Sequence, residues 1–151
     1  MRALDRSLPM ALLRARESVM AFFRPELNAA GLTEQQWRII RVLHEHDDME
    51  FHELARLACV MPPSLTGMLT RLERKRLLRR RKVPGDQRRL HVMLTNEGTA
   101  RFIAVSRCME QRYLLIEAQF GKQGLDALFK LLRQAQSLQA PQARALRTSR
   151  D

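Results

Sequence analysis

The sequence predicts a mainly helical fold with one small β-hairpin, and three observations support this. Apolar residues recur with helical periodicity along most of the chain, at positions three and four apart. The exception is segment 79–94, which has two short β-like runs around a Pro-Gly-Asp turn. A chain of 151 residues with 45% hydrophobic content is long enough for one domain, or for two small intertwined modules.

The first helix is predicted over residues 7–30, where Leu12 and Val19 belong to a run of apolar side chains at helical spacing. Pro9 is compatible with the first turn of a helix. Pro25 lacks an amide hydrogen, so it predicts a kink or an interruption. Gly31 then breaks the helical pattern.

A second and a third helix are expected next. Thr33 is placed to cap the second helix, with Gln36 three residues on in the position of a capping box. Trp37 begins its apolar stripe, and the helix is expected to end in the acidic stretch "EHDDME". The stretch "FHELARLA", residues 51–58, predicts a short third helix.

The fourth helix, within "CVMPPSLTGMLTRLERKRLL", has two different faces. Leu65, Leu69 and Leu72 form a narrow inward stripe. The opposite arc is small near its start and basic near its end, and holds Pro63, Ser64, Thr66, Gly67, Thr70, Arg71 and Arg74. Small outward side chains allow a helix to lie close against a nucleic-acid groove, so this face is predicted to bind DNA.

Basic charge is concentrated in the next segment. The chain has a net charge of +11, and residues 71–91 alone hold ten Lys or Arg against two acids. Two strands are predicted, 79–83 and 90–94, with Arg88 and Arg89 at the tip of the hairpin between them. So local a patch suggests a polyanionic partner. The alternative is a solvated charged hairpin with no partner.

Helical periodicity returns after the hairpin. Thr95 is placed to cap a long helix that reaches about Phe120, and a last helix is expected to carry the apolar residues from Leu125 to Leu138. Residues 139–151 have few large apolar side chains, which predicts a disordered tail.

Helix, short turn, helix and basic hairpin is the order of a winged helix-turn-helix, in which the second helix enters the major groove and the hairpin tip reaches the minor groove or the backbone. The stretch "GDQRRLHVMLTNEG" resembles the wing signature of the MarR-type regulators. "ELARLACVMPPSLTGMLTRLERKRLLRR" resembles their helix-turn-helix, and "GLTEQQWRIIRVL" their second helix. The match covers nearly the whole chain in order.

The resemblance implies a homodimer on a pseudo-palindromic operator. Residues 1–32 and 96–138 would form a helical dimerisation module, and residues 33–95 the winged helix-turn-helix lobe. The apolar content of the terminal helices, higher than a lone winged helix needs, agrees with this implication.

The resemblance also assigns roles within the wing. Arg88 would be the minor-groove arginine and Asp86 its orienting partner, although Asp86 could also be a simple turn-capping residue. One departure concerns Arg76, which stands where the family usually has glycine after the recognition helix. A left-handed arginine costs about 1 kcal/mol or more, so this helix is expected to end differently.

MarR-type proteins commonly bind small aromatic acids between the dimerisation helices and the DNA-binding lobe. Such a ligand needs a cation for its carboxylate and an apolar wall. The candidates for this effector site are Arg14, Arg16, Trp37, Arg41 and His44. A tryptophan at such a position is more often plain core than a ligand contact, so Trp37 could be part of the core instead. The chain is also similar to the regulators of homoprotocatechuate (4-hydroxyphenylacetate) degradation, which implies a repressor that a hydroxyphenylacetate releases from DNA.

Other functions find less support. Redox sensing needs an accessible thiolate, and Cys59 is expected to be buried in the helix-turn-helix core, while Cys108 lies in mid-helix. A metal site could draw on His44, His46, Asp48 and His52, but two histidines two positions apart on a helix point in opposite directions. No phosphate loop, nucleophile with a matched base, or paired carboxylates suggests an enzyme.

The chain is accordingly expected to be a cytoplasmic, nucleoid-associated DNA-binding protein without cofactor or membrane partner. Two alternatives stay open. One is a regulator of drug-efflux or stress genes in the same family. The other is an architectural DNA-binding protein without an effector, which would bind all sequences with similar affinity.

Overall fold

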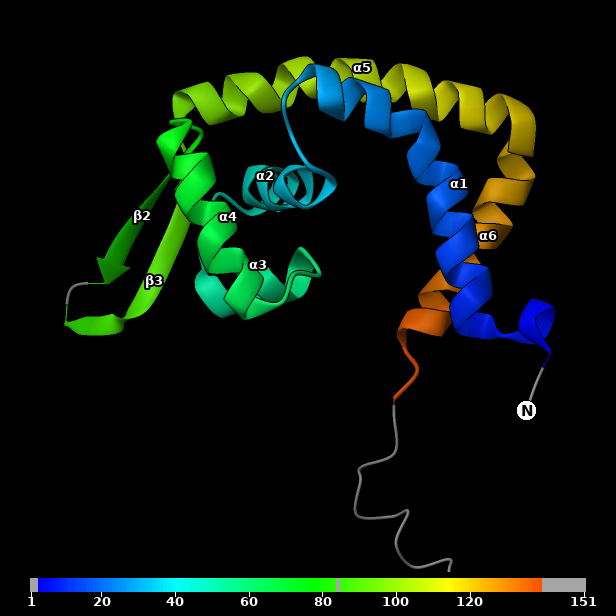
Figure 1. Ribbon diagram of the computed structural model, residues 1–151, viewed down its shortest axis with the longest axis horizontal. Helices are drawn as coiled ribbons and strands as arrows, with labels where there is room; N and C mark the ends of the chain where they lie inside the picture. Colours follow the sequence, from blue (N-terminus) through cyan, green and yellow to red (C-terminus); the bar gives the residue numbers. More distant parts are fainter. Residues whose placement is uncertain (1–2, 84, 140–151) are drawn as a thin grey trace, which may run out of the picture. The chain divides into compact units, whose positions relative to one another are not determined.

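The computed structural model describes residues 3–83 and 85–139, with the backbone alone at residues 5, 83 and 86–88. A 3-10 turn, Leu4–Arg6, precedes α1 (Leu8–Ala29), α2 (Glu34–His46), β1 (Asp48–Glu50), α3 (Phe51–Leu57), α4 (Pro62–Arg74), β2 (Leu78–Val83), β3 (Asp86–Leu94), α5 (Asn96–Phe120) and α6 (Lys122–Gln136). Figure 1 shows α4 beside the β2–β3 hairpin. This is the predicted winged helix-turn-helix, mainly α with a small antiparallel sheet. By its contacts the chain divides into two compact units, Met1–Arg112 and Tyr113–Asp151.

The sheet has a third strand that the sequence did not indicate. Its strand order is β1–β3–β2, with both pairs antiparallel. Helix α2 ends at His46, within the acidic stretch as predicted. The chain then turns at Asp47, which has a φ of 58°, and Met49 pairs with Val92. Since Met49 is 7% and Val92 0% exposed, the pairing is held by burial of apolar side chains.

The helices α1 and α2 begin and end largely as predicted. Of the two outcomes predicted for Pro25, the interruption does not occur, because α1 runs on to Ala29; the kink stays a prediction. The capping box of α2 is confirmed: the Gln36 amide donates to Thr33 Oγ1 at 3.2 Å, and the Thr33 amide donates to Gln36 Oε1 at 3.1 Å. These bonds satisfy amide groups that the first turn of a helix leaves without a partner.

One core holds the winged helix-turn-helix together. It combines the inward stripe of α4 with side chains from α2, α3 and the sheet; the most deeply buried are Ile39, Ile40, Leu43, Leu54, Leu65, Leu69, Leu72, Leu78 and Val92. Each such side chain contributes about 1.5–3 kcal/mol of transfer free energy. The face of α4 that was predicted to point inward is therefore confirmed, and its opposite face is left outside.

The end of α4 differs from the prediction. Arg76 does adopt the left-handed conformation, with a φ of 58°, although it carries a Cβ. The Leu77 amide donates to the Leu72 carbonyl at 3.0 Å and the Arg76 amide to the Glu73 carbonyl at 2.8 Å, which is the Schellman pattern of helix ends. Two hydrogen bonds and the burial of Leu77 at 2% exposure offset the cost of the left-handed arginine.

The same turn is tied to the start of α5. Thr95 Oγ1 donates to the Arg76 carbonyl at 2.6 Å and accepts from the Gly98 amide at 3.0 Å, so the predicted cap is confirmed. The approach is so close that a Cβ on Gly98 would lie 1.9 Å from the Leu77 carbonyl oxygen. A glycine is required here because any side chain would push α5 off the base of the hairpin.

The C-terminal part of the described chain contains α6 and a short end. Leu138, predicted in the last helix, lies after the end of α6. The disordered tail was predicted from residue 139, and residues 140–151 lie outside the described part of the chain. Within the described residues, no helix is long and apolar enough to cross a membrane.

Candidate functional site

The outward face of α4 has the composition that close contact with a DNA groove needs. All the predicted contact residues on this helix are open to solvent: Pro63, Ser64, Thr66, Arg71 and Arg74 are exposed, and Gly67 and Thr70 are half-exposed. The Thr70 hydroxyl donates to the Thr66 carbonyl at 3.1 Å, so it stays close to the helix surface. A Cβ on Gly67 would be 3.7 Å from Arg71 Nη2, which places that guanidinium over the glycine. The helix is thus flat at its start and cationic at its end.

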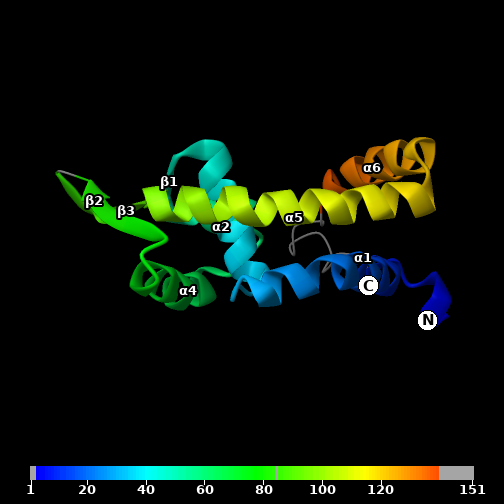
Figure 2. The ribbon, with the colours of Figure 1, turned by 90° about the horizontal axis from the view of Figure 1, so that it is seen from above.

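The hairpin projects past the first turn of α5 (Figures 1 and 2). Its regular pairing extends from Leu78, opposite Leu94, to Lys82, opposite Leu90. The register then shifts, because Val83 pairs with Asp86 and residues 87–89 have no partner on β2. Such an irregularity changes the direction of side chains near the end of a hairpin.

The predicted position of the tip was wrong. Strand β3 begins at Asp86, so Arg88 and Arg89 lie in the strand and only residues 84 and 85 connect the two strands. Gly85 has a φ of 84°, which a tight connection of this kind requires. Arg89 is exposed, whereas the side chains of Asp86 and Arg88 are outside what the structure describes.

The basic residues of the hairpin differ in how they are paired. Arg79 and Lys82 are exposed. Arg80 points to α4, where its Nε donates to Glu73 Oε2 at 3.0 Å and its amide to Glu73 Oε1 at 3.3 Å. The hydrogen bonds from Arg80, opposed by partial burial, hold the pKa of Glu73 below its usual value.

A second ion pair joins β2 to β1 through Asp48. Its carboxylate accepts from the Arg81 guanidinium and lies 3.0 Å from His91 Nδ1. Partial burial would raise the pKa of Asp48, but the hydrogen bonds from Arg81 and His91 outweigh burial and lower it. Asp48 therefore stays ionised, and it neutralises part of the positive charge on this side of the sheet.

Two of the effector candidates contact the same aromatic ring. The ring of Phe102 on α5 stacks on Trp37, with centroids 5.3 Å apart, and on His44, with centroids 3.8 Å apart. Arg41 is exposed on the same face of α2, between Trp37 and His44 in the sequence, and its Nε donates to Glu45 at 3.1 Å. The structure thus brings Trp37 and His44 together at a ring that the sequence reasoning missed, with Arg41 between them on α2.

The candidates on α1 have a different environment. Arg16 donates to Glu17 at 2.8 Å and also pairs with Glu34 at the start of α2. Arg24 donates to the same Glu34 at 2.6 Å, so a four-residue ionic network ties α1 to α2. Burial opposes the ionisation of Glu34, yet the bonds from Arg24 and Arg16 lower its pKa. Arg14 is exposed on α1.

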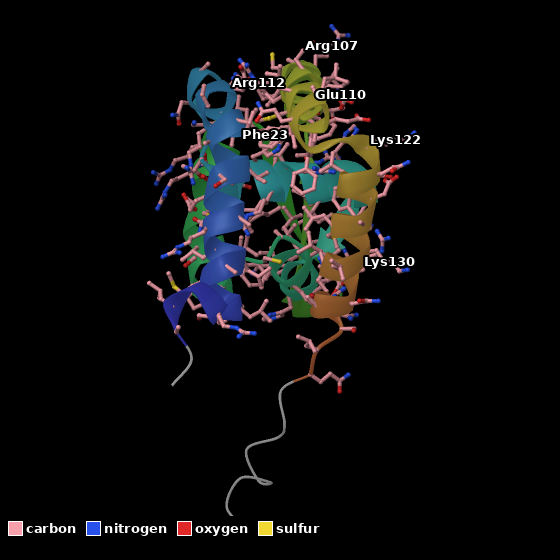
Figure 3. All side chains as sticks on the ribbon, turned by 90° about the vertical axis from the view of Figure 1, so that its right-hand side faces the viewer. Phe23, Arg107, Glu110, Arg112, Lys122 and Lys130 are labelled. Carbon is pink, nitrogen blue, oxygen red and sulfur yellow. The ribbon has the colours of Figure 1, made fainter. Side chains whose placement is uncertain are left out.

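The helix α1 is also tied to α5. Arg112 Nε donates to Glu26 Oε1 at 2.9 Å, one turn along α1 from Phe23, which is 6% exposed (Figure 3 labels Arg112 and Phe23). Arg101 adds a bond from its Nη1 to the Ala30 carbonyl at 3.1 Å. These contacts support the first part of α5 against α1 within the first compact unit.

The cysteine and metal candidates do not form a site. Cys59, expected in the core, is exposed with a φ of 50° and ends α3 in a left-handed turn. Cys108 is exposed as well. Of the metal candidates, His44 stacks on Phe102 while Asp48 pairs with Arg81 and His91, and no group of three potential ligands occurs among the described residues.

Comparisons with known proteins agree with this arrangement. The MarR family model matches residues 32–90. The homoprotocatechuate degradative operon repressor of Escherichia coli is 49% identical over 126 residues, which cover 83% of this chain and 85% of that protein. The solved structure of transcriptional regulator PA4135 has a TM-score of 0.85 at 48% identity and covers 89% of this chain and 98% of its own. NadR in complex with 4-hydroxyphenylacetate has a TM-score of 0.79 at 40% identity, with 92% and 99% covered. These similarities extend well beyond the helix-turn-helix.

Proposed function

Because the chain belongs to the MarR family of transcriptional regulators, we propose that it represses a catabolic operon as a ligand-responsive homodimer on a pseudo-palindromic operator. The observation that carries the proposal is the outward face of α4, flat at its start and cationic at its end, next to a basic hairpin. The relatives named above are regulators, and the chain is no enzyme. It would act at the nucleoid, in the cytoplasm.

In this proposal α4 enters the major groove and the wing reaches the neighbouring minor groove. Contacts with DNA would come from Pro63, Ser64, Thr66, Gly67, Thr70, Arg71 and Arg74 on α4 and from Arg88 and Arg89 on the wing, where Asp86 would orient Arg88. Arginine donates two parallel hydrogen bonds to guanine or to phosphate, so Arg71 and Arg74 would supply both specificity and affinity.

The dimer would be formed by residues 1–32 and 96–138, and residues 33–95 would contact DNA. The terminal helices support this division because they expose large apolar side chains at 40–70%: Leu8, Leu12, Leu13, Val19, Ile103, Tyr113, Leu114, Leu115, Phe120, Phe129, Leu131 and Leu138. Burying such a surface against a second copy is favourable. A two-fold axis would also set the two α4 helices about 34 Å apart, one turn of DNA.

The effector is proposed to be a small aromatic acid, and 4-hydroxyphenylacetate is the first candidate. The support is the 40% identity to NadR, whose solved complex holds that compound. Trp37 and the stacked rings of Phe102 and His44 offer an aromatic wall, and Arg41 on the same helix face offers a cation for the carboxylate. Arg14 and Arg16 would line the site from α1.

The switch requires only modest energy. A hundredfold loss of DNA affinity on ligand binding corresponds to about 2.7 kcal/mol of coupling. The first turn of α5 packs on the Leu77 carbonyl at the base of the wing, and Phe102 lies one turn further along the same helix. A ligand that changes the Trp37–Phe102 contact would therefore act on the helix that supports the wing.

The DNA-binding proposal is tested by replacing Arg88 with alanine. We expect Arg88→Ala to weaken operator binding about tenfold or more and to leave the fold intact, as measured by fluorescence anisotropy and circular dichroism. Arg107→Ala is the matched control, because Arg107 projects from α5 into solvent (Figure 3) and carries the same charge. Unchanged operator affinity of Arg88→Ala would refute the role of the wing.

The effector proposal can be tested with the chain's own fluorophore, since Trp37 is the only tryptophan. We expect 4-hydroxyphenylacetate to change the Trp37 emission and to release operator DNA over the same concentration range. Arg41→Ala should raise the ligand concentration needed for both effects about tenfold, because it removes the cation for the carboxylate. Release of DNA without any change in emission would place the ligand elsewhere.

Two other outcomes would favour other functions. Equal affinity for operator and random DNA would favour an architectural DNA-binding protein. Release by salicylate, other drug-like acids or peroxide, but not by hydroxyphenylacetates, would favour a regulator of efflux or stress genes.

A further inference from the structure

The recognition helix contains an acid where a DNA-binding surface should not need one. Glu73 is the only acidic residue in the sequence of α4, and it lies between Arg71 and Arg74, both proposed to contact DNA. A carboxylate this close to phosphates weakens binding by charge repulsion. A structural contact of Glu73 that favours DNA recognition would offset this repulsion.

Glu73 makes a contact of this kind with the wing. Both carboxylate oxygens accept from one residue of the wing: Oε2 from Arg80 Nε at 3.0 Å, and Oε1 from the Arg80 amide at 3.3 Å. The Arg80 Nη2 group donates to the same carboxylate. The bond to the amide is decisive, because it holds the backbone of β2 as well as a side chain. We call this set of contacts the Glu73–Arg80 clasp.

The position of the clasp along the hairpin lets it control the position of the far end of β2. The base of the hairpin is already held, since Leu77 is bonded to α4 and to Thr95. Arg80 lies three residues further out than Leu77, and the strand ends at Val83, about 10 Å beyond Arg80. A tilt of about 10° at the clasp would therefore move that end by about 2 Å, enough to break a hydrogen bond to a base edge.

The clasp also withholds a cation from DNA. Arg80 has a side chain 25% exposed, whereas Arg81, on the other face of the sheet, is 51% exposed. A free Arg80 could reach a phosphate, and phosphate contacts add affinity without distinguishing sequences. Pairing it with Glu73 keeps this contribution low.

We propose that Glu73 is a positioning residue for DNA recognition, which sets the angle of the wing to α4 and limits binding to non-operator DNA through its clasp on Arg80. The inference rests on the proposed contact of α4 and the wing with an operator. It adds that an acid on the recognition helix increases sequence discrimination by lowering the affinity for non-operator DNA.

The test compares two duplexes and two variants of the full-length protein. One duplex carries the site that the wild-type protein selects from a random pool, and the other is a scrambled duplex of equal length and composition. For Glu73→Gln we expect about threefold tighter binding to the scrambled duplex, a salt slope steeper by about one phosphate contact, and an operator-to-scrambled ratio about tenfold lower.

A second variant separates position from charge. Arg80→Gln breaks the clasp without freeing a cation, so the ratio should fall while the salt slope does not rise. The double variant should show no lower ratio than Glu73→Gln alone, because both changes remove the same contact. Glu53→Gln is the matched control. Glu53 pairs with Arg56 inside α3, so its substitution removes the same charge as Glu73→Gln without affecting a contact of the wing.

The possible failures are distinguishable. A wild-type ratio near one would overturn both the proposed operator binding and this inference. Two other results would overturn this inference while leaving operator binding intact. One is an operator-to-scrambled ratio that changes less than twofold in Glu73→Gln. The other is an equal fall of that ratio in Glu53→Gln and Glu73→Gln.

Discussion

Two amphipathic helices of similar length, α4 with 13 residues and α6 with 15, differ in whether their apolar faces are buried. The apolar stripe of α4 is fully covered, with Leu65, Leu69 and Leu72 all at 0% exposure. No residue of α6 is buried, and Phe129 remains 53% exposed. The difference shows that a helical pattern of apolar residues specifies a face to be covered without specifying what covers it.

The reason lies in what each helix has nearby in the chain. Helix α4 is followed at once by β2, and α2, α3 and the sheet all contribute to one core. Helix α6 belongs to a compact unit, Tyr113–Asp151, whose other described element is the end of α5. A unit of fewer than about 40 residues rarely buries enough surface to be stable by itself and usually needs an oligomer. This supports the proposed homodimer.

The largest expected effect is loss of stability in the covered region. Leu69→Ala should lower the free energy of unfolding by about 2–5 kcal/mol, because it leaves a cavity in the core. Urea unfolding followed by circular dichroism measures this. The matched change Leu131→Ala in α6, at a side chain 62% exposed, should cost less than about 1 kcal/mol within one chain. Equal costs that do not depend on protein concentration would show that α6 is covered by its own chain.

The next effect concerns association. Phe129→Ala should raise the dimer dissociation constant by about tenfold to a hundredfold, since aromatic anchors dominate apolar interfaces. Sedimentation equilibrium measures the constant, and the helix content should not change. Lys130→Ala, on the neighbouring residue of α6, is the control and should change the constant less than threefold. If the wild-type protein is monomeric at micromolar concentration, a second copy does not cover α6, and the proposed difference between α4 and α6 is wrong.

The smallest effect concerns strain within the covered region. Arg76 has a φ of 58°, so Arg76→Gly should stabilise the protein by about 1 kcal/mol. For a chain of this size the melting temperature should rise by about 2–4 °C in the absence of DNA. Arg74→Gly removes the same charge from the last residue of α4, where glycine costs about 1 kcal/mol, so it should lower the melting temperature. A lower melting temperature for Arg76→Gly would contradict the left-handed turn.

Local features were predictable to the residue, whereas contacts between distant segments were not. The capping box at Thr33 and the cap at Thr95 depend on groups three residues apart, so their sequence patterns were sufficient. The strand β1 depends on the pairing of Met49 with Val92, more than forty residues later in the chain. Its short acidic sequence has no alternation of its own, and nothing in it indicated a strand.

The same limit applies to the candidate sites. The flat and basic face of α4 followed from its periodicity, because the face of a helix is determined by sequence spacing alone. The sequence did not indicate Phe102 as a site residue, because its contact with Trp37 joins α5 to α2, two helices far apart in the chain. Cys59 was assigned to the core, yet it occupies a left-handed turn that directs it to solvent. Neither outcome is encoded in neighbouring residues.

By itself the sequence determined the helices, the caps at Thr33 and Thr95, the hairpin and the concentration of positive charge, because these depend on residues within a few positions of one another. Only the tertiary structure decided which of these charges stay available. Arg80 and Arg81 are adjacent in the sequence, but one is held by Glu73 of α4 and the other by Asp48 of β1. An ion pair depends on the distance in space between two charges and on their exposure to water, and both are set by the fold.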